Sequence, residues 1–377
     1  MSHPDRKLRV GVSINLRPGQ QSIWENGIFQ NCAFLVQLLN KSPAVKRAVL
    51  VNGGEALEAP PGMMLKETGI SIIGLAEALQ SLDVVIEMSA LLPEEWAAAF
   101  RKKGGRYAWM RVGNDYVIDI ERAMFNRPNG SLVTGKRFDA VWTLPQYEHI
   151  CKDYFELTAR APVRILPHLW SPHFFERGIS TLLPGVRYGY QPGKLRWRVC
   201  CFEPNVCLVK TSIIPMACVE EAYRARPGFL ERFHVLNTAQ LKENPSFVHF
   251  ARSLDVVNHG LTAFESRFAI YEYMAHYGDC IISHHWENAQ NYLYYEALYG
   301  GYPLVHNSEI IKDYGYYYPD FDSQAGGRAL LLAFEQHDRQ LDDYRARGKR
   351  LLKELDIDNP VNVETYTREL LNLFSGD

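Results

Sequence analysis

The fold is decided by one stretch in the carboxyl half, HHWENAQNYLYYEALYGGYPLVHN, at residues 284–307. It begins as a polar loop, continues as an apolar and aromatic run with helical character, and reaches Gly301 and Pro303 before a short apolar strand pattern. A loop that feeds a helix leaves free backbone amides near Gln290 and Asn291, where the helix dipole attracts anions. The stretch therefore predicts a βα unit whose helix start is suited to a diphosphate.

This stretch resembles the donor-binding segment of retaining GT-B glycosyltransferases of the group 1 type. In that family an acidic residue in the loop precedes a helix with a second glutamate, and here Glu287 and Glu296 stand at those positions. The resemblance implies that Glu287 faces the donor sugar and stabilises charge at its anomeric carbon, and that Glu296 binds the ribose hydroxyls. Eight residues separate the two glutamates here, against seven in the family. The alternative for each is a solvated carboxylate.

Polar neighbours of Glu287 complete the predicted donor site. His284 and His285 could contact sugar or phosphate, or could be strand-end histidines whose partners lie inside the protein. We also expect Asn288 and Asn291, close to the helix start, to bind the donor.

A second motif, RVCCFEPNVCLVKTSII, opens the carboxyl half at residues 198–214. It resembles the first strand and phosphate loop of the carboxyl-terminal GT-B domain, where a lysine at the helix start binds the donor diphosphate, and Lys210 stands at that place. The family's Gly-Arg pair is absent, and Glu203, Pro204 and Asn205 replace it. The resemblance therefore implies Lys210 as the phosphate cation, with Asn205 as an additional hydrogen-bond donor. A surface lysine is the alternative.

The loop SIWENGIFQN, at residues 22–31, is a candidate acceptor or phosphate site in the amino-terminal half. It follows the first predicted strand, and Gly27 can adopt a positive φ that lets a ligand approach the backbone closely. The other candidate residues of this loop supply stacking and polar contacts: Trp24, Glu25 and Asn26.

A further candidate, WMRVGNDY at residues 109–116, ends another predicted strand of the amino-terminal half. Arg111 could clamp an anionic group, and Asp115 could act as a general base if the reaction inverts configuration. His168 lies in a turn that resembles the end of the amino-terminal GT-B domain. It could contact the donor or be purely structural.

Short apolar runs alternate with helical patterns along the chain, which indicates βα units around parallel sheets. The alternation lapses in a segment rich in glycine and proline, so we expect an amino-terminal domain at 1–175, a linker at 176–194 and a carboxyl-terminal domain at 195–345. Amphipathic helices at 346–377 are expected to cross back to the first domain. The predicted fold is α/β of the GT-B type, two Rossmann-like domains facing a central cleft with ligands at the carboxyl ends of the strands.

Composition and missing motifs exclude several classes of protein. The chain has 41 basic and 43 acidic residues and a net charge of −2, without the basic excess typical of nucleic-acid binding. No export signal or membrane-span pattern is present, so we expect a cytoplasmic protein. The patterns GxGxxG, HExxH, GxSxG and the P-loop are absent, and neither a cofactor nor a divalent metal is expected. Peripheral membrane association and a homo-oligomer are left open.

SIWENGIFQN together with HHWENAQNYLYYEALYGG makes the chain similar, over nearly its full length, to an uncharacterised bacterial glycosyltransferase-like family. The resemblance implies transfer of a hexose-like sugar from a nucleotide-sugar donor to a glycan or other cell-envelope acceptor, which could be lipid-linked or a protein, with retention of configuration. Two alternatives stay open: a nucleotide-sugar epimerase or hydrolase, and a sugar-nucleotide-binding subunit that has lost catalysis.

Overall fold

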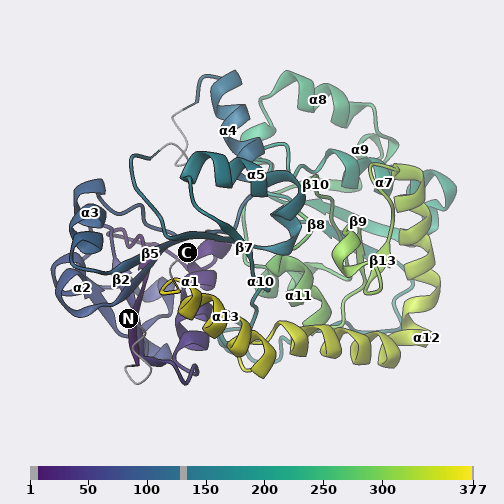
Figure 1. The fold of residues 1–377 in the computed structure, drawn as a ribbon. Coiled ribbons are helices and arrows are strands. Elements are labelled where there is room, and N and C mark those ends of the chain that lie inside the picture. The colour runs from purple at the N-terminus through teal and green to yellow at the C-terminus, as the bar shows by residue number, and fades with distance from the viewer. Residues whose placement is uncertain (1–6, 128–133, 376–377) are drawn as a thin grey trace. The chain divides into compact units, whose positions relative to one another are not determined.

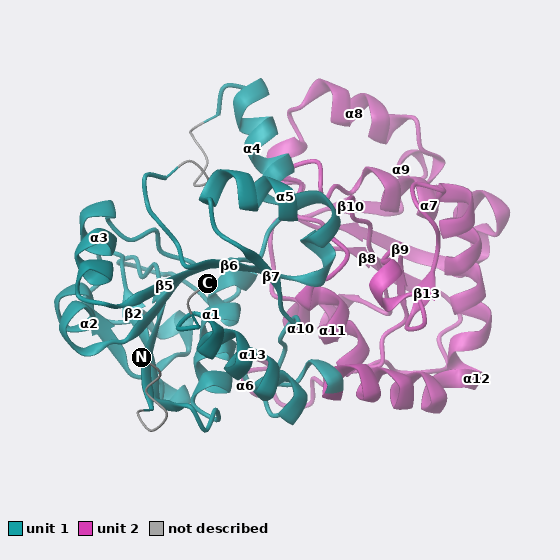
Figure 2. Ribbon diagram, in the orientation of Figure 1, with its two compact units in different colours: residues 1–174, 354–377 teal, residues 175–353 magenta. Residues whose placement is uncertain are grey.

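A computed structural model describes residues 7–127 and 134–375. The chain divides into two compact units (Figure 2), of which unit 1 comprises residues 1–174 and 354–377 and unit 2 comprises residues 175–353. The helices α6 (His173–Ser180) and α12 (Ser323–Leu355) carry the chain from unit 1 into unit 2 and back again. Unit 2 is therefore one continuous segment, whereas unit 1 is built from two.

Unit 1 contains a sheet of seven parallel strands in the order β3-β2-β1-β4-β5-β6-β7. The strands are β1 (Leu8–Ile14), β2 (Val45–Asn52), β3 (Ile72–Gly74), β4 (Val84–Glu87), β5 (Arg106–Arg111), β6 (Ala140–Thr143) and β7 (Val163–Ile165). The inner strand β1 has the largely apolar sequence LRVGVSI and is buried on both faces: Val10, Val12 and Ile14 are fully buried on one face, and Gly11 and Ser13 are buried on the other. A parallel sheet that is covered by helices on both faces requires this kind of continuous apolar run.

The helices of unit 1 cover both faces of this sheet. They are α1 (Gly27–Leu39), α2 (Leu75–Ser81), α3 (Glu94–Lys102), α4 (Asp115–Met124), α5 (Glu148–Ala159) and α13 (Pro360–Asn372). Because crossovers between parallel strands are right-handed, the reversal of strand order places α1 on one face and α2 to α5 on the other. Figure 1 shows α1 and α5 on opposite sides of the sheet, and α13 packs beside α1.

The last helix, α13, is an integral part of unit 1. The hydroxyl of Tyr366 donates a hydrogen bond to the Pro167 carbonyl at 2.7 Å, and the hydroxyls of Thr367 and Ser42 are hydrogen-bonded to each other at 2.7 Å. Both partners belong to the amino-terminal segment, so the end of the chain completes a unit that its beginning started.

Unit 2 repeats the plan with six parallel strands in the order β10-β9-β8-β11-β12-β13. The strands are β8 (Trp197–Cys201), β9 (Leu230–Val235), β10 (Thr262–Phe264), β11 (Cys280–Ile282), β12 (Leu304–His306) and β13 (Tyr316–Tyr317). The remaining helices are α7 (Ile213–Ala225), α8 (Pro245–Arg252), α9 (Asp255–Asn258), α10 (Ile270–Tyr277) and α11 (Tyr292–Tyr299). Most of residues 176–194, the expected linker, pack within this unit, where Tyr190 N donates to the Gly300 carbonyl at 2.9 Å.

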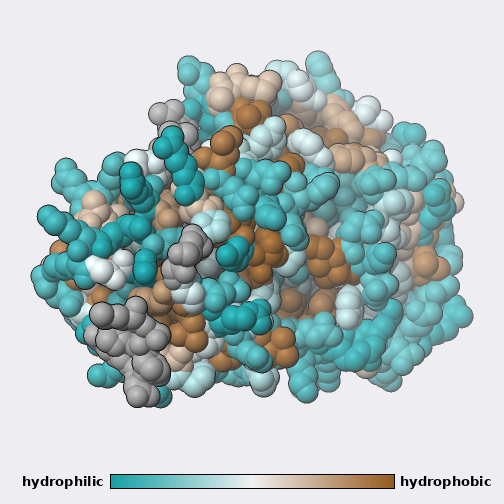
Figure 3. Space-filling view, in the orientation of Figure 1, coloured by the Kyte–Doolittle hydropathy of each residue, from teal (hydrophilic) through white to brown (hydrophobic). Residues whose placement is uncertain are grey.

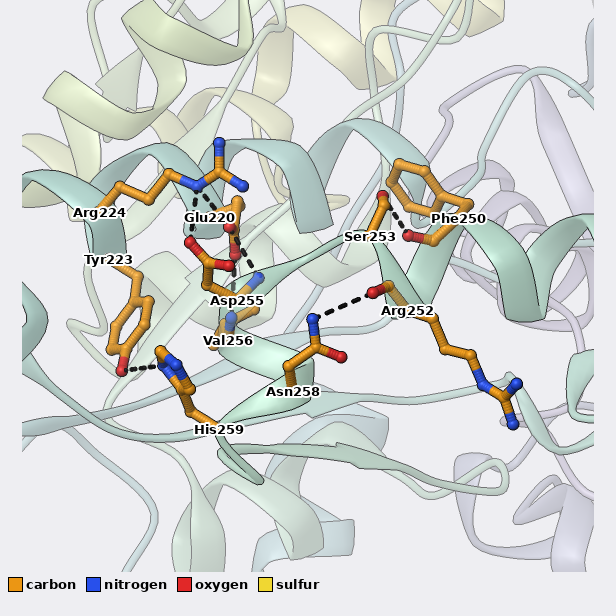
Figure 4. A network of polar contacts seen from close by, with 10 residues as sticks. All are labelled: Glu220, Tyr223, Arg224, Phe250, Arg252, Ser253, Asp255, Val256, Asn258 and His259. Carbon is orange, nitrogen blue, oxygen red and sulfur yellow. Dashed lines mark hydrogen bonds and ion pairs between the residues drawn. The ribbon is translucent and has the colours of Figure 1, made fainter.

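A buried carboxylate, Glu220, fixes α9 against α7 (Figure 4). It accepts hydrogen bonds from the backbone amides of Asp255 at 2.8 Å and Val256 at 3.0 Å, and from Nε of Arg224 at 2.6 Å. The amides at a helix start lack partners within the helix, so a carboxylate there stabilises the helix. These hydrogen bonds hold α7 and α9 together, so the role of Glu220 is structural.

The strand order reverses once in each sheet, between β1 and β4 in unit 1 and between β8 and β11 in unit 2. In open parallel sheets, ligands bind at the carboxyl ends of the strands where the order reverses. In unit 1 this point is formed by the loops 15–26 and 88–93, and in unit 2 by the loops 202–212 and 283–291. These loops carry most of the candidate residues, so each unit has its own candidate site.

The predicted α/β architecture, with two parallel sheets and carboxyl-terminal helices, is confirmed. None of the helices within the described ranges combines the length and the apolar character needed to cross a bilayer. Figure 3 shows hydrophilic residues over most of one face, with hydrophobic residues in smaller groups among them.

Candidate functional site

The loop that follows β8 is closed by Asn205. This residue has a φ of +54°, and its side-chain oxygen accepts hydrogen bonds from the backbone amide of Ser212 at 2.8 Å and from its hydroxyl at 3.0 Å. Its side-chain nitrogen donates to the carbonyls of Glu203 at 2.9 Å and Asn237 at 3.2 Å. Asparagine tolerates the left-handed region because its short side chain bonds locally. Asn205 therefore shapes the loop, and this arrangement leaves no side-chain hydrogen for a ligand.

The closed loop presents Lys210 in a half-buried position. Within the ranges that the structure describes, no carboxylate lies within ion-pair distance of its ammonium group. Burial lowers the pKa of Lys210, and the nearby charge of Glu203 acts in the opposite direction. A partly buried cation without an ion pair is costly unless a ligand supplies the opposite charge. Lys210 is thus suited to hold an anion.

Three hydrogen bonds join the loop after β11 to the loop after β8. The backbone N–H of Trp286 donates to the Val209 carbonyl at 2.9 Å. Oε1 of the buried Glu203 accepts hydrogen bonds from the Ser283 hydroxyl and from the backbone N–H of His284, the latter at 3.1 Å. Burial raises the pKa of Glu203 to about 7, against the effect of the nearby lysine charge. These contacts bring the two predicted motifs together.

His284 and His285 follow the end of β11, and both rings are buried. Nδ1 of His285 lies 3.1 Å from the backbone N–H of Asn288, and the backbone N–H of His285 donates to Oδ1 of Asn307 at 2.9 Å. Nδ1 of His284 lies 3.1 Å from the Tyr318 hydroxyl. Burial lowers the pKa of His284 to about 4 and that of His285 to about 3, so both rings are neutral at pH 7.

The two predicted glutamates occupy different environments. Glu287 is exposed in the loop with a φ of +50°, a conformation that is uncommon outside glycine and concentrates at functional sites. Glu296 is buried on α11, no described residue hydrogen-bonds to its carboxylate, and burial raises its pKa to about 8. Asn291 caps the same helix by accepting from the backbone N–H of Leu293 at 3.3 Å. The helix start therefore carries a cap, and a buried acid without a partner follows it.

Several buried polar atoms around these loops have no hydrogen-bond partner within the described part of the protein. They are Oε2 of Glu203, Nε2 of His284, Nε2 of His285 and Oε1 of Gln290. Buried polar groups in native proteins are nearly always paired, and an unpaired one costs about 1–3 kcal/mol. Their gathering at the switch point of unit 2 indicates a site that a polar ligand would complete.

The candidate site of unit 1 is a cavity of about 660 Å³ at the carboxyl ends of β1 and β4. Its lining includes Arg17, Glu25, Asn26, Ser89 and Arg111. Arg17 and Glu25 form an ion pair at 2.6 Å, and Asn26 caps α1. The cavity therefore offers polar groups of both signs next to a helix start.

The structure corrects the expectation for Gly27. This glycine is the first residue of α1, and within the loop 15–26 the positive φ belongs to Gly19, at +96°. The reason is that the first residue of a helix already has right-handed helical angles. Trp24 is half-buried in the same loop.

Arg111 and Asp115 are engaged with each other. Nε of Arg111 donates to Oδ2 of Asp115 at 2.9 Å, Nη2 donates to Oδ1, and the guanidinium lies 4.6 Å from the centroid of the Trp109 ring. Both side chains are buried. A two-point pair of this kind occupies both carboxylate oxygens of Asp115, so neither oxygen is free to act as a base.

His168 is buried in the segment after β7, and it is not part of the cavity lining.

The structure thus places Lys210, His285, Glu287 and Asn288 on two joined loops of unit 2. Sequence reasoning gave no role to the side chains of other residues at the same point: Glu203, Ser283, Gln290 and Asn307. The signal that could have found them is their position directly after a buried strand or before a helix, where polar residues in parallel sheets meet ligands.

Solved structures with the same architecture cover 97–98% of this chain. The glycosyltransferase of Rickettsia africae ESF-5 matches with a TM-score of 0.57 at 10% identity, covering 98% of this chain and 100% of that chain. Anabaena Alr3699/HepE, solved with UDP-glucose, matches with a TM-score of 0.53 at 12% identity, covering 97% and 99%. The pneumococcal O-GlcNAc transferase GtfA, solved with UDP and GlcNAc, matches with a TM-score of 0.56 at 8% identity, covering 98% and 100%. At these identities the likeness shows the fold, which is GT-B as predicted.

No curated protein matches the chain by sequence. A family model described as a protein of unknown function, DUF2827, matches residues 10–370. The match includes both units and both candidate sites. The chain therefore belongs to the DUF2827 family, and its fold is that of the GT-B glycosyltransferases.

Proposed function

We propose that this protein is a glycosyltransferase that moves a sugar from a nucleotide-sugar donor to a glycan, lipid-linked or protein acceptor. The observation that carries the proposal is a set of buried polar atoms near Lys210 which, like its ammonium group, have no partner in the described part of the chain. This set is suited to a ligand that has both anionic oxygens and hydroxyl groups, as nucleotide sugars do. The shared fold and the UDP-glucose in the Anabaena HepE structure support the same class of ligand.

Unit 2 holds the donor in this proposal. Lys210 and the start of α11 balance the charge of the diphosphate. Glu296, buried and without a hydrogen-bond partner among the described residues, binds the ribose hydroxyls. Glu287, exposed in the loop, faces the sugar and stabilises positive charge at the anomeric carbon.

The acceptor binds at unit 1, and the transfer retains configuration. The bond between the anomeric carbon and the diphosphate oxygen breaks while the acceptor oxygen bonds to the same face of that carbon. The acceptor proton passes to the departing diphosphate, so no protein base is required. This route is compatible with Asp115, both of whose oxygens are taken by Arg111.

The first test is thermal denaturation of the protein with a panel of UDP-, GDP-, ADP- and dTDP-sugars, because a ligand of the native state raises the melting temperature. Each nucleotide sugar that stabilises the protein is then incubated with the protein and candidate acceptors. The anomeric configuration of the product is determined by NMR. Consumption of the donor without an acceptor would favour the epimerase or hydrolase. Binding without any turnover would favour the non-catalytic subunit.

A pair of variants separates the site from the scaffold. Glu296→Ala should abolish turnover of the donor while the protein stays folded, because Glu296 makes no hydrogen bond to another described residue. Glu220→Ala is the matched control: it removes a buried glutamate of the same unit that caps α9. It should lower stability without lowering turnover per folded molecule. Full activity of Glu296→Ala would refute the assignment.

A further inference from the structure

The two adjacent histidines after β11 are held in opposite neutral tautomers. The backbone N–H of Asn288 donates to Nδ1 of His285 at 3.1 Å, so the ring proton of His285 is on Nε2. The Tyr318 hydroxyl gives its one hydrogen to the Ser283 carbonyl at 3.0 Å, so its oxygen accepts from Nδ1–H of His284 at 3.1 Å. Nε2 of His284 therefore carries a lone pair. The loop presents one donor and one acceptor on neighbouring rings.

Neither Nε2 atom has a hydrogen-bond partner among the described residues. His284 is 2% exposed and His285 8% exposed, so an unpaired atom on either ring carries the cost of burial. The nearby His306 shows what a purely structural histidine does: its Nε2 donates to the Tyr314 carbonyl at 2.6 Å and its Nδ1 accepts from the backbone N–H of Ser308 at 3.1 Å. The two loop histidines each use one nitrogen internally, and the other has no partner among the described residues.

The charge of Lys210 acts on the His285 ring. After burial, it is the largest influence that lowers the pKa of His285, and the hydrogen bond between Trp286 and Val209 fixes the two loops to each other. An N–H donor near an unpaired ammonium group attracts the same kind of anionic oxygen. Because the ring is neutral, it adds a directional contact without a second positive charge that would repel the lysine.

We propose that Nε2–H of His285 donates a hydrogen bond to a phosphate oxygen of the donor near Lys210, and that Nε2 of His284 accepts one from a hydroxyl of the same ligand. This inference rests on the proposed function and adds two specificity-determining residues to it. The two histidines recognise one hydrogen-bond acceptor and one hydrogen-bond donor on the ligand. A nucleotide sugar that lacks either group leaves a buried ring nitrogen unpaired.

Asparagine and glutamine test each nitrogen separately, because the asparagine amide lies near the position of Nδ1 and the glutamine amide near that of Nε2. His285→Asn keeps an acceptor for Asn288 and removes the donor to the ligand. His285→Gln keeps a donor at the outer position and removes the internal contact. Binding is measured by calorimetry with whichever of UDP, GDP and ADP the wild-type protein binds best, together with the melting temperature of each variant.

We expect His285→Asn to bind this diphosphate about tenfold more weakly with little change in melting temperature. His285→Gln should bind within about threefold of the wild-type protein and melt at a lower temperature. The reverse pattern, with binding kept by His285→Asn, would overturn the assignment of His285.

His284 is tested in the same way with the corresponding nucleotide sugar. His284→Asn keeps the donor to Tyr318 and removes the outer acceptor, so it should bind the nucleotide sugar about tenfold more weakly. His284→Gln restores an acceptor at the outer position and should recover most of that affinity. Equal binding by the two variants and the wild-type protein would overturn the role of His284.

The control is His337, whose Nδ1 lies 3.0 Å from the Tyr316 hydroxyl and whose Nε2 lies 3.0 Å from the Gly301 carbonyl. His337→Asn should lower the melting temperature without changing ligand affinity. If the wild-type protein binds no nucleotide diphosphate and no nucleotide sugar, the proposed function fails and this inference fails with it. If the wild-type protein binds them and every His284 and His285 variant binds equally well, this inference alone fails.

Discussion

The backbone N–H of Trp286 donates to the carbonyl oxygen of Val209 at 2.9 Å, across the switch point of unit 2. This hydrogen bond ties the loop of Lys210 to the loop of His285 and Glu287. Residues that are far apart in the sequence thereby become one site whose parts can be tested one at a time.

Replacing Lys210 with methionine should weaken binding of a nucleotide diphosphate about 100-fold, because the variant loses a charge-assisted contact to phosphate. Thermal stability should stay the same or rise, since the half-buried ammonium has no ion pair among the described residues. Calorimetry and thermal melting measure the two effects. The control is Lys312→Met, at an exposed position of the same unit. Unchanged affinity in Lys210→Met would contradict the phosphate role.

Stability should depend on pH through Glu296. Burial raises the pKa of Glu296 from 4.5 to about 8, so the folded state favours the protonated form. Protonated Glu296 therefore contributes its full stabilisation to the folded state below about pH 4.5, and this contribution is lost as the pH rises from there through 8. Between pH 6 and 9 the wild-type protein should therefore lose roughly 2 kcal/mol more than Glu296→Gln, seen as a melting temperature that falls several degrees further. Parallel curves for the two proteins would show that Glu296 is ionised in the fold.

Asn205 should stabilise the folded protein by fixing the conformation of its loop. Asn205→Ala removes the side-chain bonds to Ser212, Glu203 and Asn237 and places an alanine at a φ of +54°. We expect a loss of roughly 2–4 kcal/mol in the free energy of unfolding, and about 1 kcal/mol less for Asn205→Gly, because glycine tolerates the left-handed region. Urea denaturation measures both. A variant that keeps its stability and loses only ligand affinity would instead indicate direct contact with the donor.

Arg111 and Asp115 should stabilise unit 1 only when both are present. Arg111→Met and Asp115→Asn each leave a buried group without its partner, at a cost of roughly 3–5 kcal/mol for the unpaired charge. The double variant should lose clearly less than the sum of the two single losses. A double-mutant cycle in urea measures this coupling, and additive losses would show that the two side chains stabilise the unit independently.

The architecture follows from the sequence because strands buried on both faces need continuous apolar runs, and these are visible between helical patterns. The same reasoning fails for the shortest elements. No strand or helix is predicted at β10 (Thr262–Phe264) or α9 (Asp255–Asn258), since three or four residues are too few to show a period. Their stability comes from tertiary contacts such as the cap that Glu220 provides for α9.

The candidate site is only partly visible in the sequence. Lys210 and Glu287 stand within motifs, whereas Glu203 is noticed there only because it replaces a familiar pair. A glutamate in a sequence is expected to be solvated. Its burial here depends on Ser283, 80 residues further along the chain, a contact that no local pattern can indicate. The conformation of Asn205 and the tautomers of the two histidines likewise depend on distant partners.

The way the chain enters and leaves unit 1 has a consequence for its biosynthesis. The segment 354–377 is synthesised after all of unit 2, so the ring of Tyr366, 6.4 Å from that of Trp142 in the folded protein, reaches the amino-terminal sheet only after unit 2 has been made. Unit 2 is continuous and can close its sheet while the nascent chain is still growing. Unit 1 must wait for the segment that follows unit 2, and until that segment binds, the apolar surface it will cover is a natural target for chaperones.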